Sequence, residues 1–154
     1  MIKLNLGSGY TKMDGYVNID IDKNWNPDIV CDIRKLPYPD DHADEIFSSH
    51  TLEHFYIREC HDVLKEWKRI LKKDCPIVLV VPNVQNAAKL FVENKIPDEF
   101  FLERLAGADQ QATEYMPHYN WFWNRRLMLI LAQCGFRNMQ ILDDGWDLAM
   151  QAVK

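Results

Sequence analysis

The chain has 154 residues, of which 47% are hydrophobic and 12% aromatic. A chain of this length and composition can bury the core of one domain, which excludes intrinsic disorder. Its net charge of -5 at pH 7 argues against a protein that binds its partner mainly by neutralising phosphates. We therefore do not expect nucleic acid among its partners.

The four cysteines are widely spaced and form no Cys-x-x-Cys pair; they are Cys31, Cys60, Cys75 and Cys134. This spacing indicates neither a zinc site nor a redox motif, so we expect reduced thiols. The sequence shows no signal peptide, and no stretch approaches the roughly 20 apolar residues that a membrane helix needs. These features predict a soluble, cytoplasmic protein that has no contact with a membrane.

Apolar runs rich in Ile and Val alternate with helical patterns along the chain, which predicts a parallel sheet covered on both faces. In the first part of the chain we expect four short strands, at residues 3–6, 17–21, 28–31 and 45–49. Only residues 7–16 connect the first two strands, which is close to the minimum length for a parallel crossover. Any helix in that connection must be limited to a turn or two.

A longer amphipathic helix is predicted over residues 57–72, because one face is apolar at helical spacing and the other is charged. The apolar face consists of Val63, Leu64, Trp67, Ile70 and Leu71. The aliphatic run at residues 77–81 then predicts a central strand. Shorter helical patterns follow at residues 87–93 and 98–106.

The last part of the chain predicts one helix and a hairpin. Asn124 can cap a helix that runs to Cys134, with Gly135 as its C-terminal stop. Two strand-like runs, residues 137–142 and 147–153, then flank the sequence Asp-Asp-Gly-Trp. Asp-Gly between two such runs is a strong hairpin signal, so we expect the last two strands to be antiparallel.

The first predicted strand ends in a glycine-rich turn, since residues 4–9 read Leu-Asn-Leu-Gly-Ser-Gly. Glycine has no side chain, so the backbone can turn tightly there and approach a ligand. Asp20 ends the second predicted strand, which lies beside this turn in a parallel sheet. A carboxylate in that place can accept hydrogen bonds from two ribose hydroxyls. The two features together predict a ligand that contains adenosine.

The carboxylates near this turn have alternative roles. Asp20 can be a solvated strand end, and Asp22 competes for the ribose because strand alternation puts both residues on the same face. Asp32 follows the third predicted strand, where aspartate is often engaged in local hydrogen bonds. Spacing alone does not separate these alternatives.

In this order, the elements resemble the class I S-adenosylmethionine-dependent methyltransferases, in particular their small type 11 group. Residues 4–9 match the first motif of that family, Asp20 its acidic ribose ligand, and Cys31-Asp32-Ile33 its third motif. Residues 43–54 resemble the segment along the fourth strand that borders the methionine end of the cofactor. Two departures are the short first crossover and Lys73-Asp74-Cys75-Pro76 in place of the usual glycine pair.

The resemblance implies a Rossmann-like α/β fold with a doubly wound, seven-stranded sheet. The sheet is mostly parallel, and its antiparallel C-terminal strand is inserted between strands five and six. The cofactor implied is S-adenosyl-L-methionine, with S-adenosyl-L-homocysteine as the product. The resemblance implies that the cofactor is bound by Asn5, Leu6, Gly7, Ser8, Gly9, Asp20, Ile21, Asp32, Ile33, Ser49 and His50.

Three histidines are candidates for the chemistry. His50 follows the fourth predicted strand, where it can reach the transferred methyl group or an acceptor proton, or can cap the next helix. His54 is more typical of packing against that helix. His118 lies in the aromatic run 115–123, which lines an acceptor pocket or covers the sheet as an apolar lid. We take His50 and His118 as the catalytic candidates.

The histidines show no tight ligand spacing, so the sequence indicates no metal site. We expect a single domain over residues 1–154, with residues 84–123 as a lid and acceptor-binding segment, because the first strand begins almost at residue 1. The sequence indicates neither the acceptor atom nor the oligomeric state.

The predicted function is methyl transfer to a small-molecule or glycan-like acceptor. One alternative is a catalytically inactive module that binds S-adenosylmethionine or S-adenosylhomocysteine and serves as a partner subunit or sensor. Another is a nucleotide-sugar or nicotinamide enzyme on a related sheet. The incomplete glycine fingerprint disfavours this last alternative, since Lys12 stands where its third glycine belongs.

Overall fold

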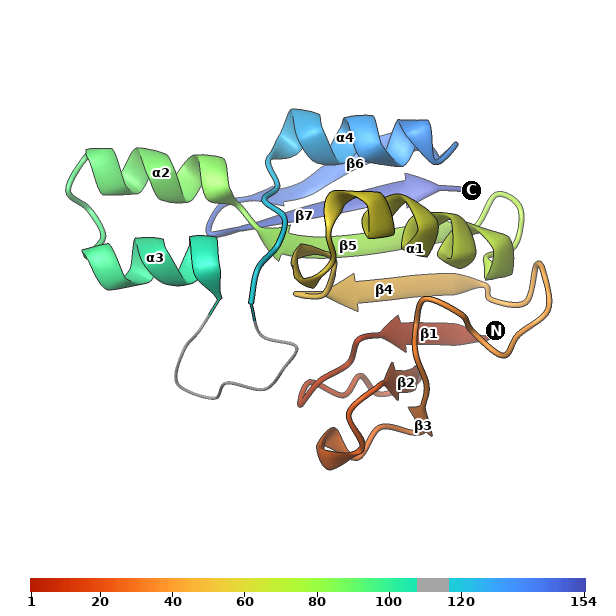
Figure 1. The fold of residues 1–154 in the computed structure, drawn as a ribbon. Coiled ribbons are helices and arrows are strands. Elements are labelled where there is room, and N and C mark those ends of the chain that lie inside the picture. The colour runs from red at the N-terminus through yellow and green to blue at the C-terminus, as the bar shows by residue number, and fades with distance from the viewer. Residues whose placement is uncertain (108–116) are drawn as a thin grey trace.

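A computed structural model describes residues 1–107 and 117–154. Its strands form one sheet in the order β3-β2-β1-β4-β5-β7-β6. The strands are β1 (Lys3–Leu6), β2 (Val17–Asp20), β3 (Ile29–Val30), β4 (Glu45–Ser49), β5 (Pro76–Pro82), β6 (Arg137–Asp144) and β7 (Asp147–Val153). The first five are parallel, and β7 runs antiparallel between β5 and β6 (Figure 1). This is the seven-stranded Rossmann-like sheet that the sequence predicts.

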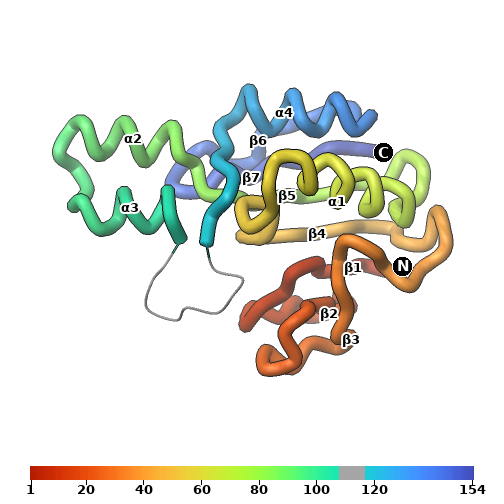
Figure 2. Tube along the Cα trace, viewed as in Figure 1, coloured from red at the N-terminus to blue at the C-terminus, as the bar shows by residue number. Residues whose placement is uncertain are grey.

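Helical segments connect the strands in the described ranges. They are η1 (Lys23–Trp25), η2 (Leu52–His54), α1 (Ile57–Ile70), α2 (Val84–Val92), α3 (Asp98–Ala106) and α4 (Asn124–Gln133). Helices α1 and α4 lie on one face of the sheet, and the α2–α3 pair stands beyond the carboxyl end of β5 (Figure 1 and Figure 2). None of the described helices is long and apolar enough to cross a membrane.

The core lies between the sheet and the α1–α4 layer. Leu4, Ile46 and Ile77 are aligned across β1, β4 and β5, and all three are fully buried. Trp67 of α1 belongs to the same buried cluster, and its indole Nε1 donates a hydrogen bond to the Ile33 carbonyl at 3.0 Å. Burial of these apolar side chains is the main source of stability, and the indole hydrogen bond keeps the ring in place.

The opposite face of the sheet is less buried. The next row along the same strands contains Asn5, Phe47 and Val78, and the last two are only half-buried. The connections from β1 to β2 and from β2 to β3, both fully described, contain the short helix η1 but no α-helix. The prediction that the first crossover holds little or no helix is therefore confirmed.

The element boundaries follow the sequence prediction closely, but the predicted helix cap at Asn124 is wrong. Trp123 precedes α4 in an extended conformation, and Asn124 is the first helical residue. The Asn124 side chain instead donates a hydrogen bond to Asp144 Oδ2 at 2.8 Å. A tertiary contact with β6 has thus replaced local capping. Gly135 ends the helix at φ +81°, as predicted.

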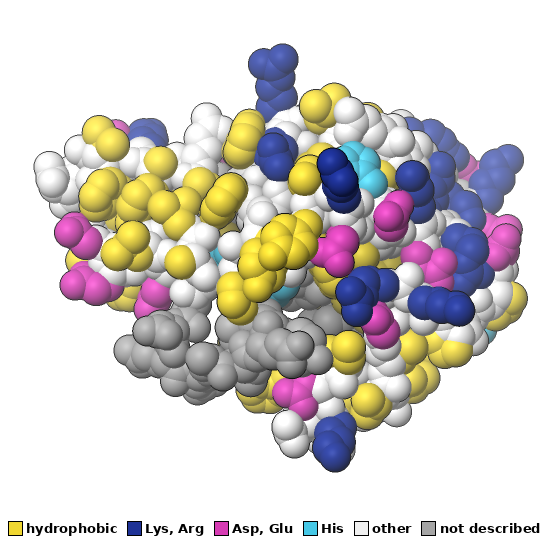
Figure 3. Space-filling view, in the orientation of Figure 1, with side chains coloured by type: hydrophobic (Ala, Val, Ile, Leu, Met, Phe, Trp, Pro, Cys, Tyr) yellow, Lys and Arg dark blue, Asp and Glu magenta, His cyan; other side chains and the backbone are white. Residues whose placement is uncertain are grey.

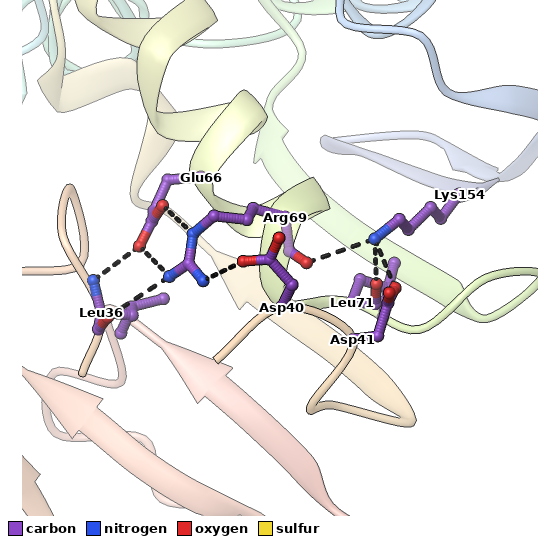
Figure 4. Close-up of polar contacts among 7 residues, drawn as sticks. All are labelled: Leu36, Asp40, Asp41, Glu66, Arg69, Leu71 and Lys154. Atoms are coloured by element: carbon purple, nitrogen blue, oxygen red, sulfur yellow. Dashed lines mark hydrogen bonds and ion pairs between the residues drawn. The ribbon is translucent and has the colours of Figure 1, made fainter. Parts of the chain in front are cut away.

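A polar network fastens the C-terminal end of α1 to its surroundings (Figure 4). Arg69 contacts the two oxygens of Glu66 through Nε and Nη2, each at 2.8 Å, and Asp40 through Nη1 at 2.7 Å. Glu66 also accepts a hydrogen bond from the Leu36 backbone N–H at 2.9 Å. Lys154, directly after β7, donates to the Arg69 carbonyl at 3.2 Å. The network joins the connection before β4 and the end of the chain to α1.

Replacing Arg69 with alanine should lower the free energy of unfolding by about 1 to 2 kcal/mol, because Glu66 and Asp40 lose a shared, partly buried cation. Arg58→Ala is the matched control, since Arg58 is exposed on the same helix and makes no ion pair with the described residues. Urea unfolding followed by tryptophan fluorescence measures both variants. Equal stability of the two variants would contradict the importance of the network.

Candidate functional site

The turn after β1 requires glycine at residue 7. Gly7 has a φ of +70°, a left-handed conformation that other residues rarely adopt. A Cβ at this position would collide with the Thr51 side chain, which packs directly on the turn. Gly9 is also left-handed, at φ +49°, but a Cβ there would meet open space. Gly7 therefore allows the carboxyl ends of β1 and β4 to approach each other.

Asp20 holds the glycine turn from the end of β2. The Asp20 Oδ2 accepts a hydrogen bond from the Gly9 N–H at 2.7 Å, and Oδ1 accepts one from the Asp22 N–H at 2.9 Å. A carboxylate offers about four acceptor positions, so Asp20 keeps some for a ligand. Asp22 uses its own Oδ1 to cap η1 through the Asn24 N–H. Both carboxylates line the same cavity, so the choice between them stays open.

This first cavity has a volume of about 460 Å³ and opens at the carboxyl ends of the parallel strands. Its size is in the range of small-molecule and cofactor sites. Of the residues that the sequence assigns to the cofactor, it is lined by Gly7, Gly9, Asp20, Ile21, Asp32, Ile33 and His50. Trp25 of η1 and Tyr119 add aromatic surface to its walls.

Asp32 lies on the wall of the first cavity, but its carboxylate is already engaged. Arg34 Nε lies 3.0 Å from each of its oxygens, and Arg34 Nη2 lies 2.8 Å from Oδ2. These hydrogen bonds from the Arg34 guanidinium lower the pKa of Asp32. Asp32 therefore makes the local hydrogen bonds that one sequence alternative predicts, and it also lines the first cavity.

A second cavity of about 440 Å³ adjoins the first, and the two share Gly7, Gly9, Trp25, His50 and His54. Its other polar lining residues include Asn5, Ser8, Ser49, Glu53 and His118. The Ser8 hydroxyl is buried and has no hydrogen-bond partner among the described residues. A buried hydroxyl without a partner is typical of a site that receives a polar ligand.

Asn5 and Leu6 are the last residues of β1 and support the glycine turn that follows them. The Asn5 Nδ2 donates hydrogen bonds to Asn18 Oδ1 at 2.9 Å and to the Thr11 carbonyl at 3.1 Å, so both of its N–H donors are already used. Leu6 is fully buried in the core and is not among the lining residues of either described cavity. Its carbonyl accepts a hydrogen bond from Ser48 Oγ at 2.8 Å, which braces β1 against β4.

His50 lines both cavities from a strained backbone position. Its φ of +51° is unusual for a residue other than glycine. Its Nε2 lies 3.3 Å from Asp147 Oδ2, and its Nδ1 lies 3.3 Å from Glu53 Oε1. Asp147 and, next, Glu53 raise the pKa of His50 to about 9, so the imidazole is cationic at neutral pH. Arg104 contacts the other oxygen of Asp147 at 2.6 Å.

Sequence reasoning misses Glu53, although it stands next to His54 at the predicted ligand edge. Glu53 is only 1% exposed, and its backbone carbonyl accepts hydrogen bonds from the N–H groups of Tyr119 and Asn120 at 2.8 and 3.1 Å. These bonds bring the returning chain onto η2. His118 thereby reaches the wall of the second cavity, where burial lowers its pKa.

The polar and aromatic contacts of His54 are with this returning chain. Its Nδ1 lies 3.2 Å from the Pro117 carbonyl, and its ring meets that of His118 edge to face, with centroids 5.1 Å apart. The sequence favours packing of His54 against the following helix. The structure adds the contacts of the imidazole with residues 117 and 118, which the sequence does not indicate.

The aromatic run 115–123 is divided between the two roles considered for it. Residues 115 and 116 lie outside the described ranges. Tyr119 lines the first cavity and packs against Tyr56, with ring centroids 4.5 Å apart. Phe122 is fully buried, and its carbonyl accepts a hydrogen bond from the Val84 N–H at 3.1 Å. One part of the run therefore forms a cavity wall, and another part packs in the core.

Residues 10–79 match a family model described as a methyltransferase domain. No curated protein matches the chain. Among solved structures, an S-adenosylmethionine-dependent methyltransferase from Thermotoga maritima has a TM-score of 0.70 at 14% identity, covering 99% of this chain and 82% of its own. Another from Archaeoglobus fulgidus has a TM-score of 0.69 at 17% identity, with coverages of 99% and 85%. The chain has the class I S-adenosylmethionine-dependent methyltransferase fold.

The resemblance that the sequence shows to this family is thus confirmed. A third neighbour is a 1,6-didemethyltoxoflavin-N1-methyltransferase from Burkholderia thailandensis, solved with S-adenosylhomocysteine. It has a TM-score of 0.65 at 15% identity, covering 99% of this chain and 70% of its own. The family match and the methyltransferase fold support S-adenosylmethionine as the cofactor. The residues here fit such a group, because Gly9 leaves open space beside the backbone, Asp20 keeps free acceptor positions and the Ser8 hydroxyl lacks a partner among the described residues.

Gly7→Ala should destabilise the protein more than Gly15→Ala. Both glycines are left-handed, at φ +70° and +81°, so each substitution strains the backbone by about 1 kcal/mol. Only at Gly7 would the new methyl group also collide with Thr51, which adds about 1 to 3 kcal/mol. Thermal unfolding measures the difference.

A double variant provides the control for this explanation. Adding Thr51→Ala to Gly7→Ala removes the hydroxyl and methyl group that lie closest to the new Cβ, so part of the lost stability should return. If the two glycine variants were equally unstable, or the double variant recovered nothing, the collision would not be the cause.

Proposed function

We propose that this protein transfers the methyl group of S-adenosylmethionine to a small-molecule or glycan-like acceptor. The observation that carries this proposal is the junction of two cavities at Gly7, Gly9 and His50. One cavity contains the carboxylates that follow β2 and β3, and the other contains histidines and small polar groups. A cofactor with an adenosine end and a reactive methionine end needs two connected spaces of this kind.

We assign the adenosine end to the first cavity. The free acceptor positions of Asp20 can bind ribose hydroxyls, and Ile21 and Ile33 give apolar surface for the base. From there the glycine turn leads to the second cavity. The unpartnered Ser8 hydroxyl lies on that side, so we assign the methionine end to it.

The acceptor enters through the second cavity in this proposal. S-adenosylmethionine, when bound, supplies a methyl group that its positive sulfur already activates. The residues of the chain then have to align the acceptor atom with the carbon–sulfur bond, at roughly 3 to 3.5 Å from the methyl carbon, and to keep water out. Positioning is therefore the main task of the site.

The two histidines have different parts in that task. His50 is held as a cation by its ion pairs with Glu53 and Asp147, so both ring nitrogens are protonated and neither has a free lone pair with which to accept a proton. His118 has a lowered pKa and is neutral, so it can orient an acceptor through its remaining ring nitrogen. We assign both to positioning of the acceptor and the reactive end of the cofactor.

The charge distribution favours a small acceptor over nucleic acid. Lys and Arg side chains gather at the end of the molecule where α1 terminates, which is the opposite end of the sheet from the cavities (Figure 3). The net charge is -5. Within the segment 84–123, residues 118 and 119 line the cavities, and we propose that this part forms the acceptor-side wall.

Calorimetric titration with S-adenosylmethionine, S-adenosylhomocysteine and NAD tests the cofactor class. We expect both sulfur compounds to bind and NAD not to bind. Incubation with S-adenosylmethionine and a panel of hydroxyl, amine, thiol and sugar acceptors should then release S-adenosylhomocysteine. Failure of both sulfur compounds to bind would overturn the proposal, and binding without turnover across the panel would favour a sensor or partner subunit.

Asp20→Asn should weaken the binding of S-adenosylhomocysteine by about 1 to 3 kcal/mol, because an amide donor replaces one of the carboxylate acceptors that the ribose needs. Asp22→Asn is the matched control and should bind almost as well as the unmodified protein. Calorimetry gives the affinities, and circular dichroism checks that both variants fold. If Asp22→Asn weakened binding more than Asp20→Asn, Asp22 would be the residue that binds the ribose.

A further inference from the structure

The second cavity contains a cluster of metal-ligand side chains, of which the proposed function uses only His118. Glu53, His54 and His118 each offer one ligand atom, and these atoms all lie within 4.8 Å of one another. Glu53 and His54 are neighbours on η2, whereas His118 belongs to the chain that returns after α3. Tertiary contacts create this cluster, which explains why the sequence spacing gives no sign of it.

Glu53 is buried without adequate partners. It is 1% exposed, and neither carboxylate oxygen accepts a hydrogen bond from the described residues. His50 Nδ1 lies 3.3 Å from Oε1 as an ion pair, but His50 is shared with Asp147, and Oε2 has no such counterpart. Burying a carboxylate with so little compensation costs several kcal/mol unless a cation or further donors satisfy it. The position of Glu53 on the cavity wall therefore favours a positive ligand there.

Both histidines present a free lone pair. The His54 Nδ1 lies 3.2 Å from the Pro117 carbonyl, and the His118 Nδ1 lies 3.1 Å from the Arg104 carbonyl. Because a carbonyl oxygen only accepts, each Nδ1 carries a proton, and Nε2 is the ring nitrogen whose lone pair can bind a metal ion. An outer hydrogen bond of this kind is the usual companion of a metal-binding histidine, since it fixes the tautomer and the ring direction.

Backbone hydrogen bonds hold the three residues in this arrangement. The Glu53 carbonyl binds the N–H groups of Tyr119 and Asn120, directly after His118. The His118 N–H donates to the Ala106 carbonyl at 3.1 Å, which ties the same segment to the end of α3. The side chains therefore face one another across a hydrogen-bonded junction, and little ordering is needed to assemble a metal site.

We propose that Glu53, His54 and His118 bind one divalent transition-metal ion. Two imidazole nitrogens and one carboxylate oxygen form the ligand set that suits Zn²⁺ or Fe²⁺. With bonds near 2.1 Å, the ligand atoms of a four-coordinate ion lie about 3.4 Å apart, so small side-chain rotations bring the three atoms into range. Three protein ligands leave at least one coordination position open toward the second cavity.

The role of the ion rests on the proposed function, whereas the site itself does not. The open position lies in the cavity that Ser49 and His50 also line, where we expect the acceptor. An acceptor atom bound there is held at a fixed place relative to the methyl group. The site thus favours acceptors with a metal-binding hydroxyl, carboxylate or amine.

Titration with Co²⁺ tests the site directly. Co²⁺ binds to nitrogen and oxygen sites of the same kind, and its visible absorption reports the coordinating atoms. The full chain, freed of any purification tag, is treated with EDTA, dialysed and titrated with Co²⁺. We expect one Co²⁺ per chain, with the spectrum of mixed nitrogen and oxygen ligands, and displacement by Zn²⁺. No binding, or binding of several ions with equal and weak affinity, would overturn the proposal.

Substitutions locate the bound ion. Glu53→Gln, His54→Gln and His118→Gln should each weaken Co²⁺ binding by a factor on the order of 10 to 100 or more. His61→Gln is the matched control, because its ring nitrogens are engaged at 3.0 Å by the Ile57 carbonyl and by Gln133 Oε1. Its affinity should equal that of the unmodified protein. A loss as large in the His61 variant, or no loss in the three others, would contradict the site.

Two further measurements keep the test decisive. Thermal unfolding shows whether each variant is folded, and the two histidine variants carry the test if Glu53→Gln is not. Calorimetry with S-adenosylhomocysteine in EDTA separates the two proposals. Cofactor binding without Co²⁺ binding would remove the metal site alone, and Co²⁺ binding without cofactor binding would remove the proposed function alone.

Discussion

The contact between Gly7 and Thr51 positions the whole carboxyl edge of the sheet. Because Gly7 has no side chain, Thr51 packs against the turn after β1, and its hydroxyl bonds the Ser49 carbonyl at 3.1 Å. This places η2 immediately beyond the turn, and with it the buried Glu53. The Glu53 carbonyl then holds the backbone of residues 119 and 120. The walls of both cavities therefore depend on one close approach between two strands.

The fold is largely predictable from the sequence, because most of its signals are local. Strand β4 (Glu45–Ser49) has its predicted bounds, and its residues alternate between half-buried and buried positions, as a strand requires. Gly135 ends α4 because its left-handed φ of +81° is a property of that one residue and depends on no distant contact. The Asn124 cap fails for the opposite reason: the amide can bond its own backbone or Asp144, and the choice depends on where β6 lies. Local patterns carry no information about that position.

The residues of the candidate site also divide into those that a local pattern predicts and those that depend on distant contacts. The glycine turn and Asp20 are predictable because a strand end and its neighbour across a parallel pair carry a recognisable local pattern. Asp147 is not, because it reaches His50 only through the antiparallel register that pairs it with Pro82. The cluster of Glu53, His54 and His118 depends on contacts between residues still farther apart in the sequence, because hydrogen bonds join η2 to the chain after α3. Sequence reasoning therefore finds the glycine turn and the carboxylate beside it, and misses the partners of the histidines.

The strand order explains why these halves meet where they do. Strands β1 and β4 are neighbours in the sheet, yet the chain leaves them in opposite directions, and α/β sheets bind ligands in the crevice at such a point. On the β1 side the connections are short turns, so the wall of the first cavity there includes the glycine turn and the carboxylates that follow β2 and β3. On the β4 side the wall combines His50 and the η2 residues with residues 118 and 119, and these last two belong to no strand. If the second cavity receives the acceptor, as we propose, replacing that returning segment would change the acceptor wall and leave the glycine turn intact, so we expect the segment to set acceptor specificity.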